Sequence, residues 1–300
     1  MISGISTWTK RHPLIVYIVL AYAITWAFEL PLAAARQGWA QLSVPSAIHY
    51  LGAFGPMSAA LIVTGMTQGG SGVRELFRGL LKWRVPWRWV LFCVFSPIAM
   101  FALAALVMRL TSDVWPDLSL LGDVEYLPYL GIGGALILWL LTWGLGEEMG
   151  WRGFALPRLQ QGRSALTASI LLGVVHAFWH LPAFFYKDTY MTMGLAAGLP
   201  MLVLSVIAAA IVFTWIYNST GGSLLMVIIF HALFDMLSVS KAGGASAPAV
   251  MSGVVWVLAA VVVIVFKPAN LSRLPKQAVV SDKVQIPIVV GRGHGLPGKA

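Results

Sequence analysis

The sequence predicts an all-α, polytopic membrane protein, and three observations indicate this fold class. Hydrophobic residues make up 59% of the 300 residues and charged residues only 10%, whereas soluble domains carry roughly 25% charged residues. The mean hydropathy is +0.82. The apolar residues fall into stretches of roughly 20, which is the length that a helix needs to cross a bilayer. The composition therefore excludes an ordinary soluble domain.

Taken in chain order, eight apolar stretches are bounded by glycine, proline or charged residues, which mark their ends. They cover approximately residues 13–35, 47–66, 89–110, 131–155, 165–186, 193–217, 223–240 and 247–266. The first stretch is too long for the apolar part of a signal peptide, which spans about 7–15 residues. The sequence thus predicts a bundle of eight transmembrane helices within residues 1–266, followed by a disordered basic tail at 267–300.

The basic residues predict the orientation of this bundle. If the helices alternate sides, all but four of the 20 Lys and Arg residues fall on the side of the amino terminus. The exceptions are Arg36, Arg109, Lys187 and Lys241. Because basic loops stay in the cytoplasm, both termini are expected to be cytoplasmic, and the short loops suggest a bacterial plasma membrane. Membrane orientation thus explains the net charge of +9, and no nucleic-acid partner is needed.

Two acids and an arginine interrupt the fourth apolar stretch, in the segment Gly146–Arg152. Ionisable groups at such depth are costly, so they are functional candidates. Glu148 and Arg152 are four residues apart and can pair on one helix face, whereas Glu147 points about 100° away. The spacing predicts that Glu148 is held by an ion pair, whereas Glu147 stays unpaired and available for a chemical role.

The fifth and seventh stretches add imidazoles and a third carboxylate. His176 and His180 lie four residues apart, as do His231 and Asp235, so each pair shares one helix face. Counting from the loops places these four residues and Glu147 at similar depths, near the middle of the membrane. Imidazoles and carboxylates together suit hydrolysis, which needs a base to deprotonate water and a donor or cation for the oxyanion. The single cysteine, Cys93, excludes an intrachain disulfide and a cysteine-based zinc site.

These residues also carry a family resemblance over approximately residues 131–238. The matching motifs are Glu147-Glu148 with Arg152, Gly153 and Phe154, then Trp179-His180-Leu181-Pro182, then Gly221-Gly222-Ser223-Leu224 and His231 with Asp235. This order resembles the CPBP (Abi) intramembrane proteases, the relatives of the type II CAAX prenyl endopeptidases. The resemblance implies an eight-helix bundle with an active-site cavity reached from the cytoplasm. It also implies that Glu147 and His180 activate water, while His231 and Asp235 stabilise the oxyanion or bind a metal.

Two features of the implied site stay open at this stage. His176 stands where the family usually has phenylalanine, so it is either a spacer or an added ligand. Glu147, His180 and His231 could hold Zn²⁺ in a three-ligand site, which favours a metalloprotease. Alternatively, Glu147 and His180 could activate water without a metal. Glu148 and Arg152 match supporting positions, and their spacing suggests an orienting ion pair.

The resulting functional hypothesis is a membrane endopeptidase that acts by intramembrane proteolysis. Its partners would be membrane lipid and a membrane-associated peptide or protein. This substrate would be cut near the cytoplasmic leaflet, and the sequence leaves open whether it bears a prenyl group. Two alternatives come from other classes. The same acids and histidines could form the relay of a proton- or cation-coupled transporter, although no inverted repeat is seen. A non-catalytic protein of the bacteriocin-immunity type is the other alternative.

Overall fold

The computed structural model describes residues 2–279, and the regular secondary structure within them is helical, with one isolated bridge between Val124 and Leu127. In the first half of the chain the helices are α1 (Ile2–Arg11), α2 (Pro13–Arg36), η1 (Ser46–Ile48), α3 (His49–Gly52), α4 (Gly55–Leu80), α5 (Trp87–Ser112) and η2 (Leu118–Gly122). The all-α class is therefore confirmed.

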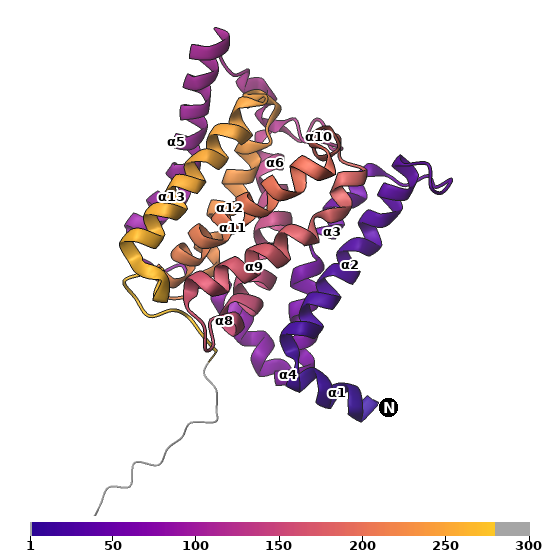
Figure 1. Ribbon diagram of the computed structural model, residues 1–300, viewed down its shortest axis with the longest axis vertical. Helices are drawn as coiled ribbons and strands as arrows, with labels where there is room; N and C mark the ends of the chain where they lie inside the picture. The colour runs from indigo at the N-terminus through magenta and orange to yellow at the C-terminus, as the bar shows by residue number, and fades with distance from the viewer. Residues whose placement is uncertain (1, 280–300) are drawn as a thin grey trace, which may run out of the picture.

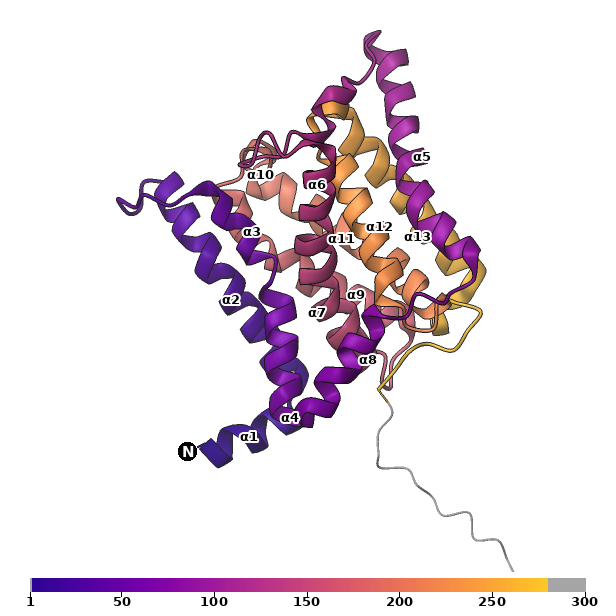
Figure 2. The same cartoon turned by 180° about the vertical axis from the view of Figure 1, so that it is seen from behind.

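The second half contains the segment with the two adjacent acids. Its elements are α6 (Gly131–Trp139), the π-helical turns η3 (Leu140–Glu147), α7 (Glu148–Gly150), the π-helical turns η4 (Trp151–Ala155), α8 (Leu156–Leu159), α9 (Ala165–Trp179), η5 (Leu181–Phe185), α10 (Asp188–Met193), α11 (Leu195–Ser219), α12 (Leu224–Ser238), η6 (Lys241–Gly243) and α13 (Ser246–Asn270). In both views α11 and α12 lie in the middle of the bundle, with α5 and α13 on one flank and α2 on the other (Figures 1 and 2).

Six helices of the described chain are long and apolar enough to cross a membrane, so a polytopic membrane protein is confirmed while the count of eight is not. The six are Pro13–Arg36, Ser46–Leu80, Trp87–Ser112, Ala165–Phe185, Leu195–Ser219 and Ser246–Asn270. The seventh predicted stretch forms α12, whose 15 residues extend only ~22 Å at 1.5 Å per residue. The fourth is divided by two π-helical parts. Both segments contain buried ionisable residues, so the criterion of helix length leaves out the two segments in which these residues lie.

The two ends of the described chain lie at the same end of the bundle (Figure 1). The placement of both termini on the cytoplasmic side of a membrane stays a prediction. Part of the expected tail contacts the bundle: Leu271 is fully buried, and Gln160 donates a hydrogen bond to the carbonyl of Gln277 at 2.7 Å. Residues 280–300 of that tail lie outside the described residues, and the domain boundaries at 266 and 267 stay predictions.

Two glycines allow the start of α4 and the turn before it to lie directly against the segment with the two acids. A Cβ atom at Gly146 would stand 2.7 Å from the carbonyl oxygen of Ala53, and one at Gly150 would stand 2.5 Å from the backbone of Pro56. Real Cβ atoms do not approach so closely, so these positions require glycine. The two glycines flank Glu147 and Glu148, and the close packing fixes the acids in the interior of the bundle.

Candidate functional site

The two adjacent acids are fully buried and leave the backbone at a junction between helix types. Glu147 is the last residue of the π-helical η3 and Glu148 the first residue of α7, and both side chains are 0% exposed. π-Helical turns are rare and occur frequently at functional sites. The wider turn helps to aim the two neighbouring carboxylates at different partners.

Glu148 belongs to a group that we call the closed quartet, which also contains Arg152, His231 and Asp235. Arg152 Nη1 donates to Glu148 Oε1 at 2.8 Å, and His231 Nδ1 lies 2.8 Å from the same oxygen. His231 Nε2 lies 3.2 Å from Asp235 Oδ2. The guanidinium of Arg152 also lies over the Phe213 ring, 4.6 Å from its centroid. Each ring nitrogen of His231 therefore faces a carboxylate, and one guanidinium and one imidazole meet two acids.

Glu147 belongs to a second group, which we call the open trio, together with His176 and His180. His176 Nε2 lies 2.7 Å from Glu147 Oε2, and one ligand atom from each of the three residues lies within 4.8 Å of the others. The His176 ring stacks between Trp151 and His180, with centroid distances of 4.8 Å and 5.2 Å. Aromatic stacking thus holds both imidazoles in line with the carboxylate.

The open trio has unused hydrogen-bonding capacity. Among the buried side-chain atoms of residues 2–279, both carboxylate oxygens of Glu147 and both ring nitrogens of His176 have no hydrogen-bond partner. The 2.7 Å contact between His176 Nε2 and Glu147 Oε2 is therefore short, but its angles are not those of a hydrogen bond. Buried polar atoms are nearly always paired, so this group has the character of a binding or reaction site.

The structure bears on each residue that the sequence singled out. The pairing of Glu148 with Arg152 is confirmed, and Glu147 indeed faces other partners. The predicted metal set of Glu147, His180 and His231 differs from what the structure brings together, because His176 stands beside Glu147 while His231 is engaged by Glu148 and Asp235. His176 Nε2 contacts the carboxylate of Glu147 at 2.7 Å, and the choice between a spacer and an added ligand stays a prediction. The catalytic roles of these residues stay predictions.

A third polar group lies where sequence reasoning did not place one. Tyr186 donates to Glu29 Oε1 at 2.9 Å, and His49 Nδ1 lies 2.6 Å from the Tyr186 hydroxyl. His49 also packs on Trp143, one turn before Glu147, with ring centroids 5.4 Å apart. The one signal in the sequence was the acid of Glu29 inside an apolar stretch. This group joins α2 and α3 to the end of η5, beside the segments that carry the open trio.

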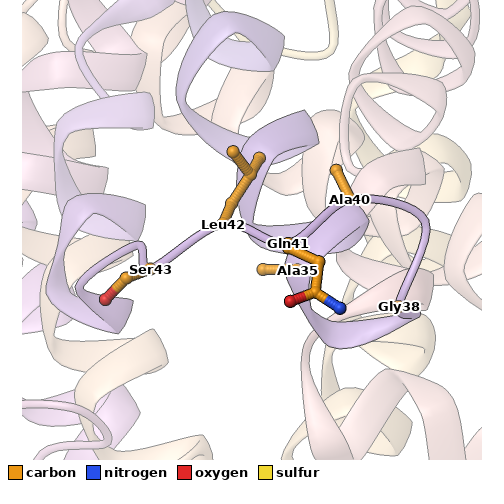
Figure 3. Close-up of a pocket in the computed structure, with 6 residues that line it drawn as sticks. All are labelled: Ala35, Gly38, Ala40, Gln41, Leu42 and Ser43. Carbon is orange, nitrogen blue, oxygen red and sulfur yellow. The ribbon is translucent and has the colours of Figure 1, made fainter.

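The loop after α2 contains a pocket that is separate from these groups. It is lined by Ala35, Gly38, Ala40, Gln41, Leu42 and Ser43 (Figure 3). None of its lining residues is ionisable, and none belongs to the open trio or the closed quartet. The pocket therefore has no part in the argument for a reaction site, and the predicted active-site cavity stays a prediction.

Fold and site together define a class: a polytopic α-helical membrane protein with a buried cluster of carboxylates and imidazoles on the segments 131–159, α9 and α12. Residues 129–237 match the family model described as "Type II CAAX prenyl endopeptidase Rce1-like". The chain is also 30% identical over 132 residues to a CAAX prenyl protease 2 of Methanococcus maripaludis, which covers 43% of this chain and 48% of that protein. The chain thus spans about half the length of this curated relative.

The matched segment begins at the start of the interrupted helix and ends within α12, so it contains all seven residues of the trio and the quartet. The family resemblance indicated by the motifs is confirmed. Residues 129–237 of the chain are thus similar to the Rce1-like type II CAAX prenyl endopeptidases.

Proposed function

We propose that this protein is an intramembrane endopeptidase that hydrolyses a peptide bond with Glu147 as the residue that activates water. One observation carries the proposal: a fully buried carboxylate lies within 4.8 Å of two imidazoles, in the segment that matches the endopeptidase family. The comparisons favour neither the transporter nor the immunity-type alternative.

In this proposal the open trio binds the attacking water. Glu147 accepts the proton of the water, and His180, the partly exposed member of the trio, orients the water towards the substrate. Proton transfer to a positioned side chain contributes typically ~10²–10⁴-fold in rate. The partner-free oxygens of Glu147 leave this carboxylate free for that task.

The closed quartet would serve the carbonyl oxygen of the substrate. Asp235 is its most exposed member, with 24% of its side chain accessible, against 7% for His231. The 3.2 Å contact between them is the longest in the quartet. A rotation of Asp235 would release the Nε2–H group of His231, which could then donate to the developing oxyanion. Glu148 and Arg152 would hold the His231 ring in place from the other side.

A divalent metal ion is compatible with the residues of the open trio, because two imidazoles and a carboxylate are the donor set of many zinc sites. Glu147, His176 and His180 would hold it. A bound Zn²⁺ ion would supply Lewis acidity towards the carbonyl oxygen and the water. The roles proposed above for Glu147, His180 and His231 concern the chain's own side chains.

The proposed substrate is a membrane-associated peptide or protein. The printed name of the relative, a CAAX prenyl protease, favours a substrate with an isoprenoid anchor near the scissile bond. The six long apolar helices indicate that membrane lipid surrounds the enzyme. We further propose that both termini face the cytoplasm of a bacterial cell, because the basic residues concentrate on that side.

The test is cleavage of a farnesylated peptide ending in a CAAX sequence by the purified protein in lipid vesicles. The Glu147→Gln variant should lose ~10²-fold or more of the turnover, since it cannot accept a proton. A matched control is Glu75→Gln, the same chemical change at a residue whose side chain is 69% exposed and pairs with Arg78. The control should cleave as the unchanged protein does. Equal turnover in the two variants would reject the proposed role of Glu147.

A further inference from the structure

We propose that Glu147, His176 and His180 form a binding site for one divalent transition-metal ion of the zinc type, with His176 as one of its ligands. The inference deepens the proposed function, on whose site it rests. It differs from the metal set expected from the family motifs, because His176 replaces His231. Its tests measure metal binding rather than turnover.

The first argument is the charge of the two groups. The closed quartet pairs two acids with Arg152 and His231 at contacts of 2.8–3.2 Å, so its charge is compensated. The open trio has one acid and two imidazoles, and neutral imidazoles leave Glu147 without a counter-charge in its group. An ionised carboxylate that is fully buried is costly unless a cation or a metal accompanies it. A divalent ion would provide that compensation.

The second argument is the availability of lone pairs. A histidine binds a metal through an unprotonated ring nitrogen. Both nitrogens of His231 lie against carboxylate oxygens, Nδ1 at 2.8 Å from Glu148 and Nε2 at 3.2 Å from Asp235, so both are already engaged by these acids. Both nitrogens of His176 are buried without a hydrogen-bond partner. His176 is therefore the imidazole that is free to bind an ion beside Glu147.

The third argument is the chemistry and spacing of the donors. His176 and His180 lie four residues apart at the end of α9 and stack at 5.2 Å, so both rings face Glu147. Two nitrogens and one oxygen suit zinc and its neighbours better than Mg²⁺ or Ca²⁺, which prefer oxygen ligands. Ligands bound at about 2.1 Å lie at most about 4.2 Å apart, so the 4.8 Å spread needs only a small side-chain rotation.

The test is the metal content of the full chain, purified without a histidine tag, loaded with Zn²⁺ and freed of excess ion. The unchanged protein should retain one ion per chain by mass spectrometry of the metal. His176→Phe, which restores the residue usual in the family, should weaken Zn²⁺ binding about 100-fold or more, because even residues that only support a ligand contribute 10–100-fold. His231→Gln and the distant His49→Gln are the matched controls, and both should bind Zn²⁺ within about threefold of the unchanged protein.

A second measurement avoids any question of whether the variants fold. X-ray absorption at the zinc edge of the loaded, unchanged protein should show two imidazole ligands. One imidazole or none would overturn the inference, as would His176→Phe binding as tightly as the unchanged protein or His231→Gln losing the ion. A protein that binds the ion but cleaves no peptide would reject the proposed function and keep this inference. Cleavage by a protein that binds no Zn²⁺ would reject this inference and keep the proposed function.

Discussion

The open trio and the closed quartet begin at neighbouring residues of one chain and meet opposite environments. Glu148 Oε1 lies 2.8 Å from both Arg152 and His231, whereas both oxygens of Glu147 lack a hydrogen bond. Both side chains are equally buried, so burial does not separate them. The difference is the charge that the neighbouring helices provide. We infer that the Glu148–Arg152 pair stabilises the bundle, whereas Glu147 is left free to bind and react.

The largest expected effect comes from removing each acid in turn. Glu148→Gln should lower the free energy of unfolding by about 3 kcal/mol, because Arg152 and His231 would lose their shared counter-charge in the interior. Glu147→Gln should leave that free energy unchanged or raise it, since it removes an unpaired charge. Denaturant titrations of both variants in one detergent measure the difference. Similar losses in the two variants would remove the distinction between the two groups.

A smaller effect is expected at the other side of the quartet. Arg152→Lys keeps the positive charge but loses the planar guanidinium, which both bonds Glu148 and lies over Phe213. We expect a loss of about 1–3 kcal/mol in the free energy of unfolding, the range of a hydrogen bond to a charged group. Arg78→Lys, at an exposed ion pair, is the control and should change it by under about 0.5 kcal/mol. Equal changes in the two variants would show that a positive charge at position 152 is enough for stability, without the planar guanidinium.

The smallest effect on stability is expected at His176. In His176→Phe the new ring would keep the stacking on Trp151, which now has a centroid distance of 4.8 Å, and would no longer place partner-free nitrogens in the interior. The free energy of unfolding of the metal-free protein should change by less than about 1 kcal/mol. A loss of several kcal/mol, by the same denaturant titration, would make His176 a structural residue of the trio.

Spacing along single helices was the most successful part of the sequence argument. The pairs Glu148–Arg152 and His231–Asp235 form as expected, because residues four apart on a helix must lie on one face. The six long apolar helices follow from composition in the same way. The π-helical interruptions of residues 131–159 were not foreseen, and neither was the close packing of Gly146 on Ala53 and of Gly150 on Pro56.

Contacts between helices were harder to anticipate. Depth in the membrane placed His176, His180 and His231 at one level but did not tell which ring would face Glu147. The Glu29–Tyr186–His49 group likewise joins residues more than 130 positions apart in the chain, as the separation of 137 between His49 and Tyr186 shows. The rotation of a helix about its own axis depends on packing against its neighbours. This rotation cannot be predicted from the sequence of that helix alone.

By itself, the sequence determined that this chain is an α-helical membrane protein and that the residues of the trio and the quartet lie within its apolar stretches, because transfer free energies and helical periodicity act residue by residue. Only the tertiary structure decided the partners: His231 joins Glu148, and His176 joins Glu147. A charge in a low-dielectric interior is stabilised by the group directly beside it. The folded arrangement of the helices, more than the identity of the two adjacent glutamates, thus separates the paired carboxylate from the free one.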